Sequence, residues 1–400
     1  MMTELKLTSL HDVHTNLRAR MVPFAGWEMP IQYEGIISEA NAVRNSSGIF
    51  DVSHMGRVIL SGSDASDLLD RVLSVQVSNM KIGQAKYSVI CNQEGFIIDD
   101  CIVYRLGEEL FLLIPNASNR ASVLDWISKF VTANMNINIS DITTDTAMIA
   151  IQGPLSESII SKAVLECGLF QFESNHEGNT PDISYLKNLR PFHITSLFFG
   201  LSATDEFHLF GNPEEKSPLV NPDGLIARTG YTGEDGFEIM IHRNQSEKIW
   251  STLHKLGAIP AGLGSRDLLR LEAGMVLYGN DMDLTTNPYE VGLGRFVKPD
   301  RSGYVAREAL LNFQKFPTNR QLVGFKMAVR NIPRHGYSIV SNGDIIGEVT
   351  SGVFSPDLGI SIGMGFVQKE FSSTGNSIQI DIRGRFYDAQ IVKMPFYLRS

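Results

Sequence analysis

The sequence predicts a multidomain α+β protein with a separate all-β domain at its C-terminal end. The chain has 400 residues, which at roughly 150 residues per domain indicates two or three domains. Helix-like and strand-like segments are mixed over about the first 320 residues, and only short strand-like segments separated by turns follow. Mixed α and β segments followed by an all-β stretch are typical of separate domains.

Composition and charge exclude several classes of protein. The chain is 43% hydrophobic and 20% charged, which is ordinary for a folded protein and excludes a disordered one. Its net charge of −9 disfavours nucleic acid and an anionic membrane surface as partners. No apolar run approaches the roughly 20 residues that span a bilayer. We therefore expect neither a nucleic-acid nor a membrane partner.

Cysteine usage indicates the compartment. Cys91, Cys101 and Cys167 are odd in number and form no C-x-x-C motif. This pattern is typical of buried thiols in a reducing compartment. The first residues resemble neither a secretory signal nor a transit peptide, so the expected location is the cytoplasm.

The first 142 residues are expected to begin with a short polar helix, followed by a segment punctuated by Pro and Gly, Met21–Tyr33. A helix is expected near Ile36–Arg44, and another from an N-cap at Ser63 through Leu73. Apolar residues on one face predict a helix over Asn116–Met135. The expected strands are Arg57–Leu60, Tyr87–Cys91, Phe96–Arg105 and Leu110–Ile114.

The middle of the chain continues this mixture. A strand is expected at Thr146–Ile151, followed by a helix to about Cys167 and by an irregular stretch, Gly168–Gly224. This stretch contains two polar arms, Glu173–Asp182 and Gly211–Gly224. The next expected elements are strands at Gly224–Thr229 and Phe237–Ile241 and helices at Ser246–Leu256 and Ser265–Met275. The C-terminal strands are expected at Gln321–Val329, Ser338–Val340, Ile345–Thr350, Ile360–Val367 and Ser377–Val392.

Common catalytic motifs are missing or misplaced. Gly359–Gly363 matches G-x-S-x-G but lies within a β stretch, where a nucleophile elbow is not found. His11 and His14 have no further Cys or His cluster nearby, so we expect no metal site. The chain contains no Walker loop and no G-x-G-x-x-G between a strand and a helix. Nicotinamide and nucleoside triphosphate chemistry therefore have no support.

Two carboxylates, Asp99 and Asp100, lie in the middle of an apolar run. Burying a carboxylate there is costly unless it is paired or hydrogen-bonded. Strand alternation turns one of the two inward. The pattern is compatible with a β-bulge or a solvated strand face, and equally with an oriented carboxylate that faces a ligand in a cleft.

A third carboxylate, Glu238, alternates with Phe237 and Ile239 on an expected strand. It is either a solvent-facing position or an acceptor for two parallel donors, such as the N3 and 2-amino edge of a pterin. Arg266 lies in the first turn of an expected helix, where a cation is electrostatically unfavourable. This favours a specific anionic partner, either Asp267 or a ligand carboxylate.

The segments that carry these residues, together with others along the chain, resemble the T-protein family of the glycine cleavage system, the folate-dependent aminomethyltransferases. The similarity runs from Leu7 to about Phe396. It includes Ile151–Pro154, Leu277–Asp281, Val349–Gly352 and Lys393–Phe396.

The resemblance implies a fold and an activity. The fold is three domains in a ring around a central folate channel, with a C-terminal barrel or jelly-roll-like domain. The implied division is 1–56 plus about 143–245, with an insertion at 168–224; 57–142 plus about 246–300; and about 301–400. The co-substrate is tetrahydrofolate, no metal is needed, and the donor is the aminomethyl group on the lipoylated glycine cleavage H-protein.

The resemblance also implies site residues. The family's catalytic aspartate falls on Asp100, its pterin-binding carboxylate on Glu238 and its folate-binding arginine on Arg266. The positions that line the folate pocket are Met55, Tyr87, Ile114 and Asn116. Arg295 stands where the family commonly has a Trp at the folate site, and as a planar cation it still covers a ring face.

Two alternative functions keep the folate site. One is a demethylase or methyltransferase that takes its one-carbon unit from a small donor, for which Arg295 and the insertion leave room. The other is a folate-binding paralogue that assists iron–sulfur protein maturation. That paralogue carries a K-G-C-Y motif, which Cys91 and Cys101 do not match.

Overall fold

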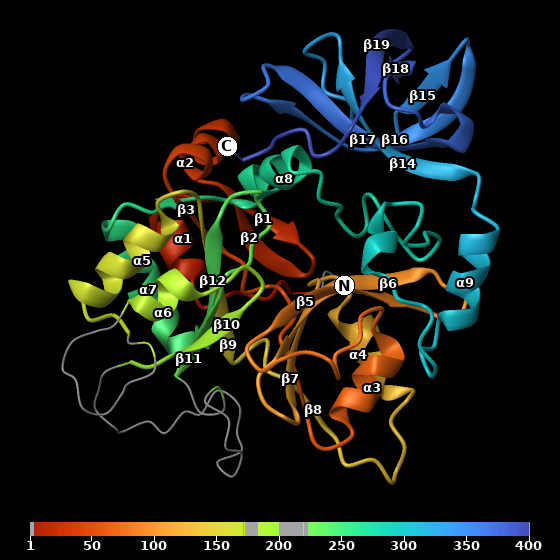
Figure 1. The fold of residues 1–400 in the computed structure, drawn as a ribbon. Helices are drawn as coiled ribbons and strands as arrows, with labels where there is room; N and C mark the ends of the chain where they lie inside the picture. The colour runs from red at the N-terminus through yellow and green to blue at the C-terminus, as the bar shows by residue number, and fades with distance from the viewer. Residues whose placement is uncertain (1–3, 171, 173–182, 200–218, 220–222, 400) are drawn as a thin grey trace.

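The computed structural model describes residues 4–170, 172, 183–199, 219 and 223–399. Over this part of the chain the protein forms three lobes around a common centre (Figure 1). The polar arm Glu173–Asp182 lies outside the described residues, as does most of Gly211–Gly224. Among the helices that the structure describes, none is long and apolar enough to cross a membrane.

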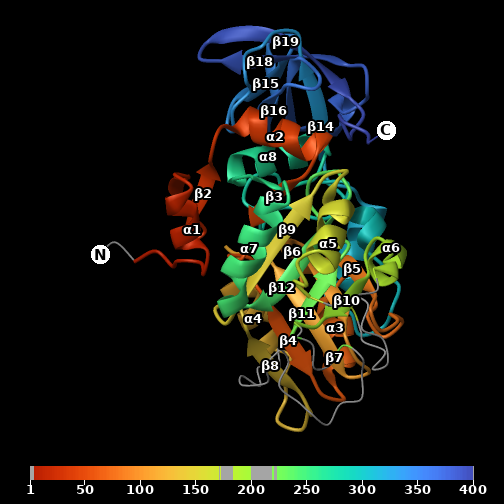
Figure 2. The ribbon, with the colours of Figure 1, turned by 90° about the vertical axis from the view of Figure 1, so that its left-hand side faces the viewer.

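The first lobe is built on a six-stranded sheet with the strand order β10-β11-β12-β9-β3-β13. Neighbouring strands are antiparallel, except that β13 runs parallel to β3. The strands are β3 Gly48–Asp51, β9 Thr146–Gln152, β10 Ile194–Leu197, β11 Gly224–Ala227, β12 Gly236–His242 and β13 Ile259–Pro260. Helices α5 Ser156–Leu165 and α7 Ser246–Lys255 cover one face, together with the short α6 Ser184–Asn188 (Figure 2).

The second lobe is built on a five-stranded antiparallel sheet with the order β5-β6-β7-β4-β8. Its strands are β4 Val58–Ser61, β5 Ala85–Cys91, β6 Ile97–Arg105, β7 Leu110–Pro115 and β8 Asn138–Asp141. Helices α3 Ala65–Val72 and α4 Arg120–Ser128 pack on one face through Leu68, Leu69, Val123 and Ile127.

The uncovered faces of the two sheets pack against each other. The residues of β12 alternate between the two faces of the first sheet. Phe237 and Ile239 point to the helices of the first lobe, and Met240 points to the other sheet. Met240 shares a buried cluster with Leu112 and Ile114 of β7. The result is a helix–sheet–sheet–helix arrangement whose middle layer holds side chains from both sheets.

The third lobe is a closed barrel with the strand order β14-β17-β16-β15-β18-β19. Closure removes the unpaired sheet edges. Its strands are β14 Arg320–Met327, β15 Ser338–Ser341, β16 Asp344–Ser355, β17 Ile360–Gln368, β18 Ser377–Ile382 and β19 Arg385–Val392. Helix α9 Arg307–Lys315 precedes it.

Helix α8 Leu263–Glu272 lies between the first lobe and the barrel (Figure 1). Its buried charges, Arg270 and Glu272, join the lobes. It packs on α2 Ile36–Asn45, on β2 Trp27–Gln32 and on β16 of the barrel. Arg270 pairs with Asp281 at 2.6 Å, and Asp281 also accepts hydrogen bonds from Thr350 and Ser351 of the barrel.

Most expected elements are present, and four segments differ. The strand expected over Ser377–Val392 is a hairpin of β18 and β19. The helix expected over Asn116–Met135 is only Arg120–Ser128, because Asn116 and Asn119 bond to Asp99 instead of continuing the helix. The segment punctuated by Pro and Gly, Met21–Tyr33, contains a hairpin, β1 Arg20–Phe24 with β2, whose turn at Ala25 and Gly26 has positive φ at both residues.

The fourth difference is the stretch Gly168–Gly224, expected to be irregular, which contributes α6 and the edge strand β10.

The domain boundaries stay a prediction, but one segment assigned to the second domain packs on the first sheet instead. Helix α7 packs on β9, and β13 pairs with β3. Residues 246–260 therefore go with the first sheet.

We expect Arg270→Met to lower the free energy of unfolding by about 3–5 kcal/mol, because it leaves the fully buried Asp281 without its cation. Urea denaturation followed by circular dichroism measures this. Asp267, the half-exposed second partner of Arg270, is the matched control, and Asp267→Asn should change stability by less than about 1 kcal/mol. Equal losses in the two variants would contradict the prediction.

Candidate functional site

Asp100 and Glu238 lie on the facing surfaces of the two sheets. On β6, Asp100 shares its side with Ile102 and Tyr104, which pack into the cluster between the sheets. On β12, Glu238 shares its side with Met240 of the same cluster. Strand alternation on two separate sheets therefore directs both carboxylates toward the layer between the lobes.

Asp99 and Asp100 are held by one asparagine. The Asn116 side-chain amide donates to Asp99 Oδ1 at 2.9 Å and to Asp100 Oδ1 at 2.8 Å, and its backbone N–H donates to Asp99 Oδ2. Asn119 donates to Asp99 as well, and the Tyr87 hydroxyl donates to Asp100 Oδ2 at 2.9 Å. Asp99 is fully buried, whereas Asp100 keeps some exposure. Asp100 is thus the member that turns to the layer between the two sheets and keeps access to a ligand.

Both carboxyl groups of this pair hold protons more tightly than usual. Burial raises the pKa of Asp99 to about 7, with a further contribution from the charge of Asp100. Burial also raises the pKa of Asp100, to about 6, against the hydrogen bonds from Tyr87 and Asn116. The two groups titrate as a coupled pair near neutral pH, where a carboxyl group is able both to give and to take a proton.

Glu238 is buried with one hydroxyl partner. Thr229 donates to its Oε2, and the Tyr104 hydroxyl lies 3.1 Å from the same Thr229 oxygen. The cross-strand neighbours of Glu238 are the small residues Ala150 and Ala227. Burial raises the pKa of Glu238, and the Thr229 bond and the charge of Arg266 oppose the rise. A carboxylate with one bonded hydroxyl has lone pairs left for a ligand.

Arg266 projects from the first turn of α8 and stacks on Tyr231, with its guanidinium carbon 4.8 Å from the ring centroid. Burial lowers its pKa, and the charge of Glu238 counteracts this. Its Nη1 atom is buried and has no hydrogen-bond partner among the described residues. Asp267, the alternative partner, bonds to Arg270 instead. The arrangement therefore leaves a buried donor for a ligand.

The remaining expected residues fall around this centre. Ile114 belongs to the cluster between the sheets, and Met55 packs against it. Arg295 is exposed and stacks on Phe296, whose ring meets Tyr87 edge-on at 4.7 Å. Arg295 thus contacts the site through Phe296, and its role in ligand binding stays a prediction.

Four further residues of the candidate site are not predicted by the sequence: Tyr104, Asn119, Thr229 and Tyr231. Tyr104 lies on β6 with Asp100, and Thr229 and Tyr231 lie between β11 and β12, shortly before Glu238. Nothing in the local sequence says which side chain turns to the centre. Asn119 was hidden inside an expected helix, whereas the structure places it at the N-cap of α4.

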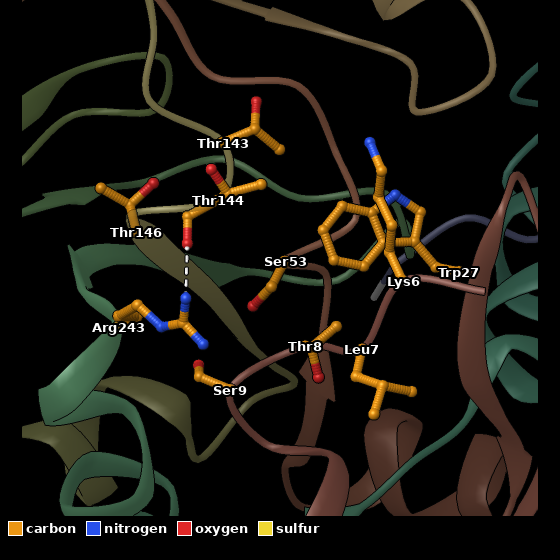
Figure 3. A pocket seen from close by; sticks show the side chains of 10 residues that line it. All are labelled: Lys6, Leu7, Thr8, Ser9, Trp27, Ser53, Thr143, Thr144, Thr146 and Arg243. Atoms are coloured by element: carbon orange, nitrogen blue, oxygen red, sulfur yellow. Dashed lines mark hydrogen bonds between the residues drawn. The ribbon is translucent and has the colours of Figure 1, made fainter. Parts of the chain in front are cut away.

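Two of the pockets on the surface of the described residues contain neither Asp100 nor Glu238. One lies between the N-terminal segment and the first sheet (Figure 3). Arg243 and Lys6 stand at opposite sides of it, and Arg243 donates to the Thr144 carbonyl. Its buried hydroxyls, such as those of Ser53 and Thr8, already donate within the protein. The carboxylates at the centre, and not this pocket, are the candidate site.

The fold is an α+β body followed by a C-terminal barrel, with buried carboxylates between the two sheets, and comparison with known proteins specifies it further. Residues 10–185 and 214–301 match the GCVT N-terminal domain, and residues 320–397 match the glycine cleavage T-protein C-terminal barrel domain. The chain belongs to the glycine cleavage T-protein family.

Individual relatives agree over the whole length. An aminomethyltransferase of Halothermothrix orenii is 39% identical over 396 residues, covering 98% of this chain and 100% of that protein. One of Thermosipho melanesiensis is 39% identical over 401 residues, covering 99% and 98%. The crystal structure of glycine cleavage system aminomethyltransferase T from Bartonella henselae superposes with a TM-score of 0.84 at 28% identity, covering 99% of both chains.

The raised pKa values predict a pH-dependent stability. Between about pH 4 and pH 7 the folded protein holds protons on the Asp99–Asp100 pair that the unfolded chain has lost, so the pair's contribution to stability falls as pH rises through this window. Asp99→Asn removes one of the two groups. Between pH 5 and 7.5 we expect the free energy of unfolding of the variant to fall by at least about 1 kcal/mol less than that of the wild type. Urea denaturation at each pH measures this, and parallel curves of unfolding free energy against pH for the two proteins would contradict it.

Proposed function

We propose that this chain is a tetrahydrofolate-dependent aminomethyltransferase of the glycine cleavage system. Its donor is the aminomethyl group held through sulfur on the lipoyl arm of the H-protein. The carbon–sulfur bond breaks to leave the dihydrolipoyl thiol, the nitrogen leaves as ammonia, and the carbon becomes the methylene of 5,10-methylenetetrahydrofolate. The full-length match to aminomethyltransferases carries this proposal.

The co-substrate supplies the amine nitrogens that take up the one-carbon unit, and the residues of this chain bind and orient it. Glu238 is suited to the N3–H and 2-amino edge of a pterin, because a carboxylate accepts two parallel donors. Arg266 has an unused buried donor for an oxygen of the same molecule. The residues present therefore fit a folate.

Asp100 is the group that holds or moves a proton beside the reacting amines. Tyr87 and Asn116 each donate to one of its oxygens, which fixes the plane of the carboxylate. Its pKa, raised by burial to about 6, lies close to neutrality. A general acid or base works best when its pKa is near the operating pH.

The partner and the location follow from the family and from the sequence. We propose the lipoylated H-protein as partner, and the cytoplasm as location on the basis of cysteine usage. The contact of Arg295 with Phe296 gives the small-donor alternative no specific support, and most of the insertion 168–224 lies outside the described residues.

The decisive assay mixes aminomethylated H-protein with tetrahydrofolate and follows ammonia and methylenetetrahydrofolate. We expect Asp100→Asn to keep the fold, because the Tyr87 hydroxyl is able to rotate and accept from the new amide. Transfer should fall by roughly 10²–10⁴-fold, the usual effect of removing a general acid or base. Tyr87→Phe, which removes only the hydrogen bond, should cost far less. Wild-type turnover in Asp100→Asn would refute the assignment.

Glu238→Gln tests the pterin contact. The amide replaces one acceptor oxygen by a donor in a buried place, so tetrahydrofolate binding should weaken by roughly 2 kcal/mol. Isothermal titration calorimetry measures this.

The wild-type assay distinguishes the two possible donors. Folate binding by the wild type without ammonia release from H-protein would favour a small one-carbon donor.

A further inference from the structure

Two buried nitrogen atoms beside the candidate site lack partners. His54 Nδ1 and Arg266 Nη1 are buried, and neither has a hydrogen-bond partner among the described residues. His54 precedes Met55 in the loop between β3 and β4, and Arg266 lies on α8. The two side chains come from different elements that meet at the same hairpin: Phe24 of β1 contacts the His54 ring, and α8, which carries Arg266, packs on β2.

His54 is an uncharged ring in a fixed position. Only 3% of the His54 surface is exposed. Phe24 of the β1–β2 hairpin meets the ring edge-on, with the two ring centroids 5.5 Å apart. Burial, with the nearby positive charges of Arg266 and Arg57, lowers its pKa to about 3, against the opposing charge of Asp51. A neutral imidazole carries one N–H.

Two buried polar groups near His54 use all their nitrogens, although five other buried atoms of the described residues, on Trp126, Trp250, Tyr289, Arg301 and Tyr304, also lack hydrogen-bond partners. Both ring nitrogens of His14 are bonded, to Asp51 and to Tyr33, each at 2.9 Å. The Arg57 guanidinium donates through Nε, Nη1 and Nη2. An unmade hydrogen bond at a buried polar atom is costly, and native proteins rarely keep one without a use.

We propose that His54 is a ligand-binding residue that donates its Nδ1–H to the same oxygen-bearing group of the co-substrate that Arg266 Nη1 binds. The proposal rests on the proposed function, because it names a further contact of the folate site. Since Arg266 only donates, the group must be an acceptor. Tetrahydrofolate offers two acceptors of this kind, the pterin carbonyl and the carboxylates of the glutamate.

The test compares folate affinity and stability in the full-length protein. His54→Leu should weaken tetrahydrofolate binding about tenfold by calorimetry. The melting temperature without ligand should stay the same or rise, because the change removes an unsatisfied polar atom. His54→Asn, whose amide lies near the Nδ1 position, should recover part of the affinity, and His54→Gln, whose amide lies near Nε2, should not. His14→Leu is the control for a bonded histidine, and its melting temperature should fall.

A double variant and a shortened ligand identify the group. If both residues bind one group, His54→Leu with Arg266→Met should lose less affinity than the sum of the single losses. Tetrahydropteroate, which lacks the glutamate, distinguishes the pterin carbonyl from the glutamate carboxylates as the group that is bound. An equal loss for both ligands places the contact at the pterin carbonyl, and a loss confined to tetrahydrofolate places it at a glutamate carboxylate.

Unchanged affinity in His54→Leu, in a wild type that binds tetrahydrofolate, would overturn the proposal and leave the proposed function standing. A lowered melting temperature with unchanged affinity would show that His54 is structural, bonded to a buried water. Failure of the wild type to bind tetrahydrofolate at all would refute the proposed function itself.

Discussion

The arrangement of the lobes depends on one helix that carries two opposite buried charges. In α8, Glu272 accepts from Arg44 of α2 at 2.7 Å and from Ser355 of the barrel at 2.6 Å. Two residues earlier, Arg270 binds Asp281. Each charge is stable in the interior only with its partners in place, so the helix has one position relative to its neighbours. Arg266 lies one turn before Arg270, and the same constraint therefore places its guanidinium at the site.

The site itself results from two sheets that face each other. A carboxylate on the outer face of either sheet would be solvated and ordinary. Asp100 and Glu238 instead lie on the inner faces, where burial raises the pKa of both groups. The buried polar atoms at the centre and the hydrogen bonds around Asp100 form a pre-organised surface for a polar ligand. Such an arrangement lowers the stability of the free protein, and ligand binding offsets this loss.

Asp99 has a different part from Asp100, although the two are adjacent. The sequence alone does not say which of the two faces a ligand. In the structure Asp99 accepts three hydrogen bonds, two from Asn116 and one from Asn119. An amide in its place would set a donor against a donor. Because Asn116 also donates to Asp100, the two carboxyl groups are joined through that asparagine.

The sequence by itself determined the mixed body, the C-terminal β lobe and the strands that carry Asp100 and Glu238, because the alternation of apolar and polar residues is a local property. Its resemblance to a family supplied the residue roles. The tertiary structure decided the rest. Whether residues 116–119 continue a helix depends on a carboxylate 17 residues away, and which of Asp99 and Asp100 turns to the layer between the sheets depends on which face of the sheet α3 and α4 cover. Such contacts join segments distant in the chain, and no local pattern encodes them. The contact of Tyr231 with Arg266 likewise forms only when α8 is in place.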